Sequence, residues 1–293
     1  MKKLAVAALF LVAACGSATT VSAHTISLAY KAGDSYKYAL HFVLNYTVGI
    51  QSMGMSVPLD LDLSAKETVK VNSVDSAGVA DVTITLTNLT TKTSANGTTT
   101  TTTTANTTVN VKIGPDGRVI SVNGNAVGSG SLPGMSATDS GFVSAILPDH
   151  AVKPGDTWSK SYDQTGVAGS TGALHVTSDN KYLRDEKVNN VAAAVVDSKI
   201  NATLDLKFDS GSGGATPLFP AGAGGMQSMA MTGSEKSDVQ SWIDTSARHV
   251  LKSHSTGSVD ATMNIKMTAG STQPGLSGPI TIKGTMTLDM NPA

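Results

Sequence analysis

The residues that could support catalysis are scattered along the chain and form no recognisable active-site motif. A nucleophile or general base needs an orienting partner beside it, yet the sequence contains neither a His-Glu-x-x-His nor a Gly-x-Ser-x-Gly pattern. Even the closest histidines in sequence, His249 and His254, would point to opposite faces of a straight strand. The others are His24, His41, His150 and His175. We therefore expect no enzyme, no metal site and no cofactor.

Methionines provide the sharpest chemical pattern. Met226, Met229 and Met231 lie close together, and Met53 and Met55 form a second pair. Clustered thioethers can bind Cu(I), but no histidine or cysteine stands beside these residues, and methionine is also a flexible apolar filler. We expect Met226, Met229 and Met231 to form an apolar flap over a pocket, with a copper site as the alternative.

Two aspartates stand in matching contexts. Gly33-Asp34 and Gly155-Asp156 each precede a strand that has an aromatic residue two positions after the aspartate. Paired carboxylates suit acid–base catalysis, but an aspartate at such a position commonly closes a turn through its own side chain. We expect all four residues to form structural turns.

These contexts belong to an internal repeat. Lys31-Ala-Gly-Asp-Ser-Tyr36 recurs as Lys153-Pro-Gly-Asp-Thr-Trp158, and later turn and strand signals follow in a similar order. Self-similarity of this kind indicates a duplicated structural unit. We expect two related β-rich halves, residues 24–147 and 148–293, divided near Leu147-Pro148.

Long windows of alternating polarity indicate that the halves are built from strands. Every even position from Tyr36 to Ile50 is apolar or aromatic, and Val57 to Val71 repeats the alternation. A period of two is typical of a strand with one buried face. Further strands are expected at Ala80 to Leu86, Val109 to Ile113, Arg118 to Val122, Ile200 to Phe208, Val259 to Met267 and Ile280 to Met290.

Turn signals such as Asp75-Ser-Ala-Gly78 join these runs directly and favour antiparallel neighbours. The expected fold is therefore all-β, with two halves of curved antiparallel sheet combined into an open barrel or half-barrel. One short helix is expected at 136–146, before Pro148.

Two segments have biased compositions. Thr90 to Thr108 is rich in threonine, and Asp209 to Gly233 is rich in glycine, alanine and methionine. We assign neither a fixed structure. The unbroken Thr98 to Thr104 run could instead extend a strand, because threonine favours β-geometry.

The N-terminus has the three-part layout of a secretory signal peptide. Lys2 and Lys3 precede an apolar stretch from Leu4 to Ala14, and small residues follow. The stretch is about half as long as a membrane-spanning helix. We expect residues 1–23 to act as signal peptide and tether, and the protein to be exported to the cell envelope.

Two cleavage sites fit this signal. Val12-Ala-Ala-Cys15-Gly16 resembles the lipobox of bacterial lipoproteins, in which Cys15 becomes an acylated N-terminus that anchors the protein to a membrane. Val21-Ser-Ala23 instead suits cleavage before His24, which would release a secreted or periplasmic soluble protein. We favour lipidation at Cys15, because the only cysteine directly follows the apolar run.

The overall charge gives no electrostatic support for two kinds of partner. The formal net charge is -1, so electrostatics do not favour nucleic acid or an anionic membrane surface. Aromatic residues make up 4% of the chain and charged residues 15%, a balance that suits β-structure joined by flexible loops.

Several short motifs resemble a family of exported bacterial proteins of unknown function, many of them lipoproteins. They are Tyr30-x-x-Gly33-Asp34-x-Tyr36-x-Tyr38, Leu147-Pro148, Val152-x-x-Gly155-Asp156-x-Trp158 and Ser241-Trp-Ile-Asp244. The resemblance spans most of the mature chain and implies no known activity and no site residues. More distantly, the expected fold is similar to lipid-carrying lipoproteins whose curved sheet cups an acyl chain, an analogy of fold alone.

These observations favour a non-enzymatic envelope protein. We expect it to bind a lipid or another hydrophobic small molecule in the concavity of its sheet, because continuous apolar strand faces have little predicted helix to cover them. The alternative is a structural or interaction module that presents surface loops, with a protein partner that the sequence does not name.

Overall fold

The protein is an all-β structure. The computed structural model describes residues 23–95, 97–104, 106–122, 125–126, 145–165, 171–209, 226–267 and 278–293. Apart from a single turn of 3-10 helix, η1 (Gln51–Met53), the regular elements in these residues are strands. They are β1 (His24–Thr25), β2 (Ser35–Ile50), β3 (Met55–Val74), β4 (Ala80–Ala95), β5 (Thr98–Thr104), β6 (Thr107–Ile113), β7 (Val119–Val122), β8 (Asn125–Ala126), β9 (Ala151–Val152), β10 (Thr157–Thr165), β11 (Thr171–Val188), β12 (Val191–Asp209), β13 (Met226–Asp244), β14 (Val250–Met267) and β15 (Gly278–Pro292).

One large antiparallel sheet contains all of these strands except β1 and β9, which pair with each other. Its order is β10-β11-β12-β13-β14-β15-β2-β3-β4-β6-β7-β8, and β5 pairs with the far part of β4. Because β10 and β8 do not pair, the sheet is not closed into a barrel. The expected antiparallel, all-β fold is confirmed.

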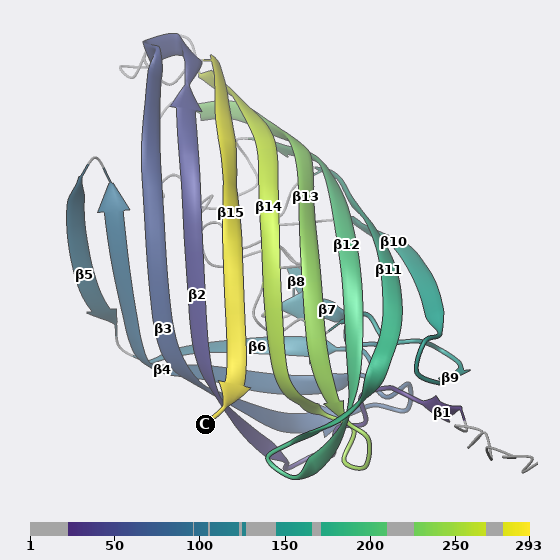
Figure 1. Ribbon diagram of the computed structural model, residues 1–293. Helices are drawn as coiled ribbons and strands as arrows, with labels where there is room; N and C mark the ends of the chain where they lie inside the picture. Colours follow the sequence, from purple (N-terminus) through teal and green to yellow (C-terminus); the bar gives the residue numbers. More distant parts are fainter. Residues whose placement is uncertain are drawn as a thin grey trace, which may run out of the picture.

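The sheet is strongly curved (Figure 1). Its curvature brings opposite ends of the strand order together, since the guanidinium of Arg118, next to β7, lies 4.9 Å from the ring centroid of Tyr162 on β10. The curved sheet thus has an inner and an outer face. In Figure 1 the β2–β3 turn lies at the upper end of the sheet, and β1 and the C-terminus lie at the lower end.

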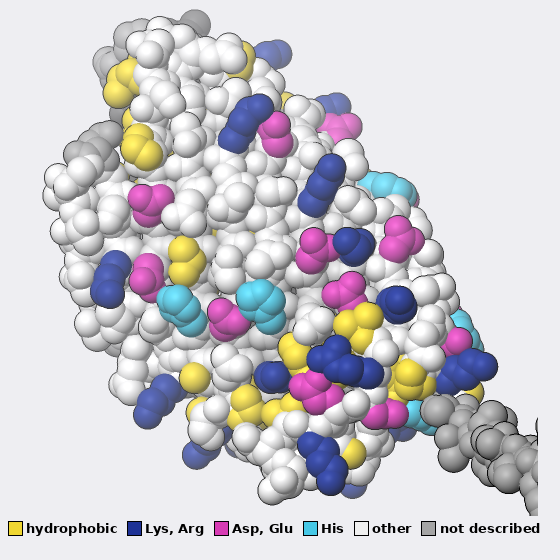
Figure 2. Space-filling model, in the orientation of Figure 1, with side chains coloured by type: hydrophobic (Ala, Val, Ile, Leu, Met, Phe, Trp, Pro, Cys, Tyr) yellow, Lys and Arg dark blue, Asp and Glu magenta, His cyan; other side chains and the backbone are white. Residues whose placement is uncertain are grey.

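Alternation along each strand separates the two faces. On β2 the even residues Tyr38, Leu40, Phe42 and Leu44 point inward and are buried, while their odd neighbours are mostly exposed. Removing this apolar surface from water stabilises the sheet by about 25 cal/mol per Å². On the outer face, Lys, Arg, Asp, Glu and His side chains are interspersed (Figure 2).

The two Gly-Asp motifs make the same backbone contacts. The Gly33 N–H donates to the carbonyl of Val71, whose own N–H donates to the carbonyl of Asp34, at 2.9 Å each. In the second copy Gly155, Tyr182 and Asp156 form the same pair of bonds, at 2.7 and 3.0 Å. Each motif therefore fixes the start of a strand, β2 or β10, against the neighbouring strand of its own half.

The two halves join edge to edge within one sheet. β15, from the second half, pairs with β2, from the first, over thirteen residue pairs from Ile280↔Ile50 to Pro292↔Tyr38. A single main hydrophobic core contains inner-face residues of both halves. A second, small cluster of Val188, Ala193, Val195 and Trp242 is separate from it.

Three segments differ from the expected local structure or lie partly outside the described residues. The helix expected at 136–146 falls outside the described residues except for Ala145 and Ile146, which are not helical. We assigned no fixed structure to Thr90 to Thr108, and this is wrong for most of the segment, because β4, β5 and β6 run through it. β5 is the strand that we gave as the alternative for the threonine run. Of Asp209 to Gly233, residues 226–233 belong to β13, and 210–225 lie outside the described residues.

No helix in the described part of the chain is long and apolar enough to cross a membrane.

Candidate functional site

A row of buried polar side chains crosses the lower half of the inner face. Asn180, Ser198 and Ser241 lie on β11, β12 and β13 and are almost completely buried. The Ser198 hydroxyl donates to Oδ1 of Asn180 at 2.6 Å, and Ser241 shares a hydrogen bond with Ser253 at 3.2 Å. Buried polar atoms need such partners, because an unpaired one costs about 1–3 kcal/mol.

These polar groups hold a strap of chain, residues 145–148, against the sheet. The backbone N–H of Ala145 donates to Oγ of Ser241 at 2.9 Å, and that of Ile146 donates to Oγ of Ser198 at 3.1 Å. The carbonyl of Ile146 accepts the Trp158 indole N–H at 3.0 Å. The strap therefore covers the inner face at this level with its own buried side chains.

The segment 26–30 covers the lower end in the same way. The N–H groups of Leu28 and Ala29 donate to the carbonyls of Pro115 and Arg248, at 2.8 Å each. The Arg248 guanidinium in turn hydrogen-bonds to Ser27. Leu28 is 3% exposed, so this segment is part of the core.

Above the strap, the inner face becomes apolar and rich in methionine. Its upper part is lined by Leu44, Leu204, Leu206, Met229, Met263, Ile265, Ile280, Ile282 and Met286, each less than a tenth exposed. Cross-strand pairing places several of them side by side, such as Met263 opposite Ile280 and Met229 opposite Ile265. This surface is the part of the described molecule whose chemistry suits an acyl chain.

Glu67 breaks the apolar inner face of β3. It is 1% exposed, and neither carboxylate oxygen has a hydrogen-bond partner among the described residues. Burial raises its pKa to about 8, so the carboxyl group is neutral at pH 7. Tyr30 and Tyr38 are close enough to interact with it electrostatically, and burial raises the pKa of both phenols.

His249 and Tyr36 form a stacked pair at the lower end. Their ring centroids lie 4.3 Å apart with the planes 22° from parallel. The Tyr36 hydroxyl donates to Asp34 at 3.0 Å, and Nδ1 of His249 lies 4.0 Å from the Asp244 carboxylate. Burial lowers the pKa of His249, which favours the neutral ring.

This lower cluster has little room for a substrate. The neighbouring cavity, lined by residues that include Asp244 and Arg248, has a volume of about 10 Å³, enough for one water molecule. Oδ1 of Asp244 already accepts the N–H groups of Ser246 and Ala247 at 2.7 Å each. The cluster is therefore built to close a turn and pack the lower end.

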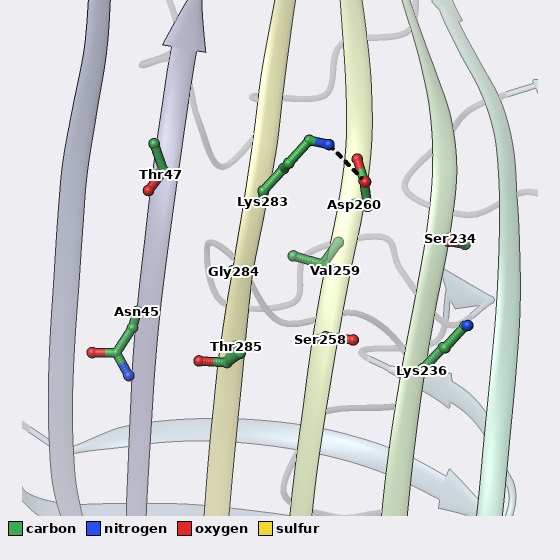
Figure 3. Close-up of a pocket in the computed structure, with 10 residues that line it drawn as sticks. All are labelled: Asn45, Thr47, Ser234, Lys236, Ser258, Val259, Asp260, Lys283, Gly284 and Thr285. Atoms are coloured by element: carbon green, nitrogen blue, oxygen red, sulfur yellow. Dashed lines mark hydrogen bonds and ion pairs between the residues drawn. The ribbon is translucent and has the colours of Figure 1, made fainter.

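A depression of about 570 Å³ lies on the outer face of β2, β15, β14 and β13 (Figure 3). It is lined by two cross-strand rows, Asn45, Thr285, Ser258 and Lys236, then Thr47, Lys283, Asp260 and Ser234, with Val259 and Gly284 between them. Lys283 and Asp260 form an exposed ion pair at 2.9 Å. Because the lining is mostly polar and open to solvent, it does not suit a hydrophobic ligand.

The three methionines expected to form a flap lie on β13. Met229 is 4% exposed and Met231 packs against the core, so both belong to the inner face. Met226 begins β13, and its side chain is outside the described residues. Met229 and Met231 are thus part of the packed inner face of the sheet.

The residues of the Gly-Asp motifs lie in turns. Gly33 and Gly155 have φ values of 93° and 99°, which favour glycine. The Asp156 carboxylate accepts the N–H of Lys153 at 3.0 Å, and Asp34 accepts the Tyr36 hydroxyl. Cys15 lies outside the described residues.

Four of the histidines sit beside aspartates on the surface. The pairs are His41–Asp62 at 3.1 Å, His150–Asp149 at 2.9 Å, His175–Asp163 at 2.5 Å and His254–Asp289 at 2.7 Å. Across the described part of the chain, no group of three or more His, Cys, Asp or Glu could hold a metal ion.

Sequence reasoning missed Glu67, Glu235 and the polar row. Glu67 occupies an inward position of β3, between Ala65 and Val69. Glu235 occupies an inward position of β13. Each is a charged residue at a position of the strand where the alternation predicts an apolar one, and this mismatch could have identified them from the sequence.

In comparisons with known proteins, no family model and no curated protein matches this chain.

Proposed function

We propose that this protein is exported to the cell envelope and binds a lipid or another long apolar molecule on the upper inner face of its curved sheet. No catalytic role is proposed. The Cys15 lipobox supports attachment to a membrane through an acylated N-terminus.

The apolar upper inner face is the observation that carries this proposal. Below it, the strap and segment 26–30 are held over the sheet by specific hydrogen bonds. At the upper level the inner face consists of apolar side chains from β2, β12, β13, β14 and β15, each less than a tenth exposed, in a sheet whose strand order is not closed. Ligand sites are commonly concave, mostly apolar surfaces of this kind.

The primary test is native mass spectrometry of protein purified from its own envelope without harsh detergent. A bound lipid is expected to appear as a mass increment that organic extraction removes. Protein that carries no lipid or other apolar molecule under these conditions would contradict the proposal.

A matched pair of variants locates the site. Met263→Gln keeps the side-chain volume near that of the native residue but puts an amide into the apolar lining, so less lipid should be retained. Asn264→Gln changes the next residue, which is exposed on the outer face, and should leave retention unchanged. Circular dichroism of both variants separates a loss of binding from a loss of fold.

The alternative function is an interaction module, and β5 favours it. All seven threonines of β5 are exposed, and β5 pairs only with β4, so its second edge has no strand partner in the described structure. Exposed edges can recruit an extended segment of another protein. A pull-down with and without residues 98–104 tests this, and unchanged partners would count against it.

A further inference from the structure

The β2–β3 turn presents an apolar tip at the upper end of the sheet. Met53 and Met55 are 46% and 48% exposed, the highest values among the large hydrophobic side chains described. In Figure 1 this turn lies at the opposite end of the sheet from β1 and the C-terminus. An exposed apolar pair at the end of a long hairpin indicates a contact surface.

The turn holds this pair in a defined geometry. Gly54, between the two methionines, has a left-handed conformation with φ of 60°, and its N–H donates to the carbonyl of Gln51 at 3.1 Å. All residues from 51 to 56 are exposed. The methionines therefore flank a tight turn and do not pack back onto the sheet.

The hairpin around the tip carries no charge. From Phe42 to Leu59 the sequence contains no Asp, Glu, Lys, Arg or His. The nearest acid on the hairpin, Asp60, lies five residues below Met55, roughly 16 Å along the strand at about 3.3 Å per residue. The tip could thus enter an apolar environment without desolvating an ionised group.

Two exposed lysines lie near the same end of the sheet. Residue pairing puts Lys266 of β14 beside Ser228, and Lys207 of β12 beside Ala230, both close to the upper strand ends. Neither lysine has an ion-pair partner among the described residues. Both are exposed on the outer face, and Asp205, also exposed, lies two residues from Lys207 on the same strand.

We propose that the β2–β3 tip docks on a lipid bilayer, with Met53 and Met55 in the interfacial region and Lys266 and Lys207 facing anionic headgroups. This inference rests on the proposed function, because a bilayer is the source or destination of an acyl chain. It also places the contact at the end where the inner face is most apolar. A protein partner is less well matched, since residues 51–58 include no Trp, Tyr or Arg, the usual anchors of protein interfaces.

Site-specific fluorescence tests the docking. Cys15, the only cysteine, is acylated or removed in either expected mature form, so Gln51→Cys supplies one labelling site at the tip. An environment-sensitive dye at position 51 should brighten severalfold on vesicles of phosphatidylethanolamine and phosphatidylglycerol, and a quencher carried on the lipid chains should reduce that emission. The same dye at Ser76→Cys, in the β3–β4 turn at the lower end, should show neither change when both labelled proteins begin at His24 and carry no acyl anchor.

Two sets of variants assign the contacts. Met53→Ser with Met55→Ser should abolish the tip signal, because the transferred apolar surface is lost. Lys207→Gln with Lys266→Gln should weaken docking on phosphatidylglycerol vesicles but not on pure phosphatidylcholine vesicles. A tip dye that stays in water on every vesicle, or is protected only by a protein extract, would overturn the proposal.

The docking and the proposed function fail separately. If the methionine variant still carries lipid by native mass spectrometry but its tip no longer enters vesicles, lipid binding stands and the tip is its membrane contact. If the wild-type tip enters vesicles but the protein never carries lipid, only the proposed ligand is wrong.

Discussion

The backbone N–H of Ile146 donates a hydrogen bond to the hydroxyl of Ser198 across 3.1 Å, at a point where both residues are almost fully buried. Ser198 also donates to Asn180, whose side-chain amide reaches the carbonyl of Trp158. The strap is thus held by a continuous network of buried polar groups. Such networks stabilise one arrangement when every member is satisfied.

Ser198→Ala should destabilise the protein by roughly 1–3 kcal/mol, because it leaves the Ile146 N–H and the Asn180 carbonyl oxygen without their partner. Urea unfolding measures the change. Ser64→Ala removes a hydroxyl from the exposed face of β3 and should cost less than about 0.5 kcal/mol. Equal effects of the two substitutions would argue against a strap held by Ser198.

Because the carboxyl group of Glu67 is buried, we expect the free energy of unfolding of the protein to fall as pH rises. Its folded pKa, about 8, lies above the value of 4.5 for an unperturbed glutamate, so between these values the folded state holds a proton that the unfolded state has released. Stability is therefore lost across this window, by up to about 4 kcal/mol at its upper end.

Glu67→Gln removes this titration. The free energy of unfolding of the variant, relative to the wild type, should rise steadily between pH 4.5 and about 8. Chemical denaturation at a series of pH values checks it. Asp60→Asn, at an exposed position of β3, is the control for a general charge effect. A difference that does not change with pH would mean that Glu67 is not buried as described.

The strands that sequence reasoning located best are those whose inner face is uniformly apolar. β2 alternates along its length and β15 does so except at Gly284, so the sequence predicts which of their residues face inward. β13 was missed because its inward positions include Glu235, Ser237 and Ser241, which disguise the period of two.

The polar inward positions could not be explained locally. Ser241 and Ser198 bind backbone groups 96 and 52 residues away along the chain, in the strap. On β4, Asn88 has a φ of 54° and interrupts the alternation. The buried residues are even-numbered up to Leu86, whereas Leu89 is the next buried one. Both effects depend on tertiary contacts, which a pattern of residue types does not encode.

The matched turns at Gly33 and Gly155 predict matched costs of substitution. An added Cβ would touch nothing at either glycine, so Gly33→Ala and Gly155→Ala isolate the backbone strain of φ near 93° and 99°. Each should destabilise the protein by about 1–2 kcal/mol, and by similar amounts. Thermal or urea unfolding of both variants tests this. A large difference would show that the two copies of the motif do not play equivalent roles.

The N-terminus of the mature protein decides how far the upper tip stands from an anchoring membrane. We expect cleavage before Cys15 and acylation, so intact mass spectrometry should give the chain from Cys15 plus its acyl groups. Residues 15–23 would then span at most roughly 30 Å at about 3.4 Å per residue, whereas the sixteen residues of β2 alone span roughly 50 Å. With the strands perpendicular to the membrane, a tether at the lower end is therefore too short for the tip to reach the membrane that holds the anchor. In the acylated protein the dye at Ser76 should lie nearer the anchoring bilayer than the dye at Gln51. A mass that begins at His24 would contradict the anchor and leave the protein free to present either end to a membrane.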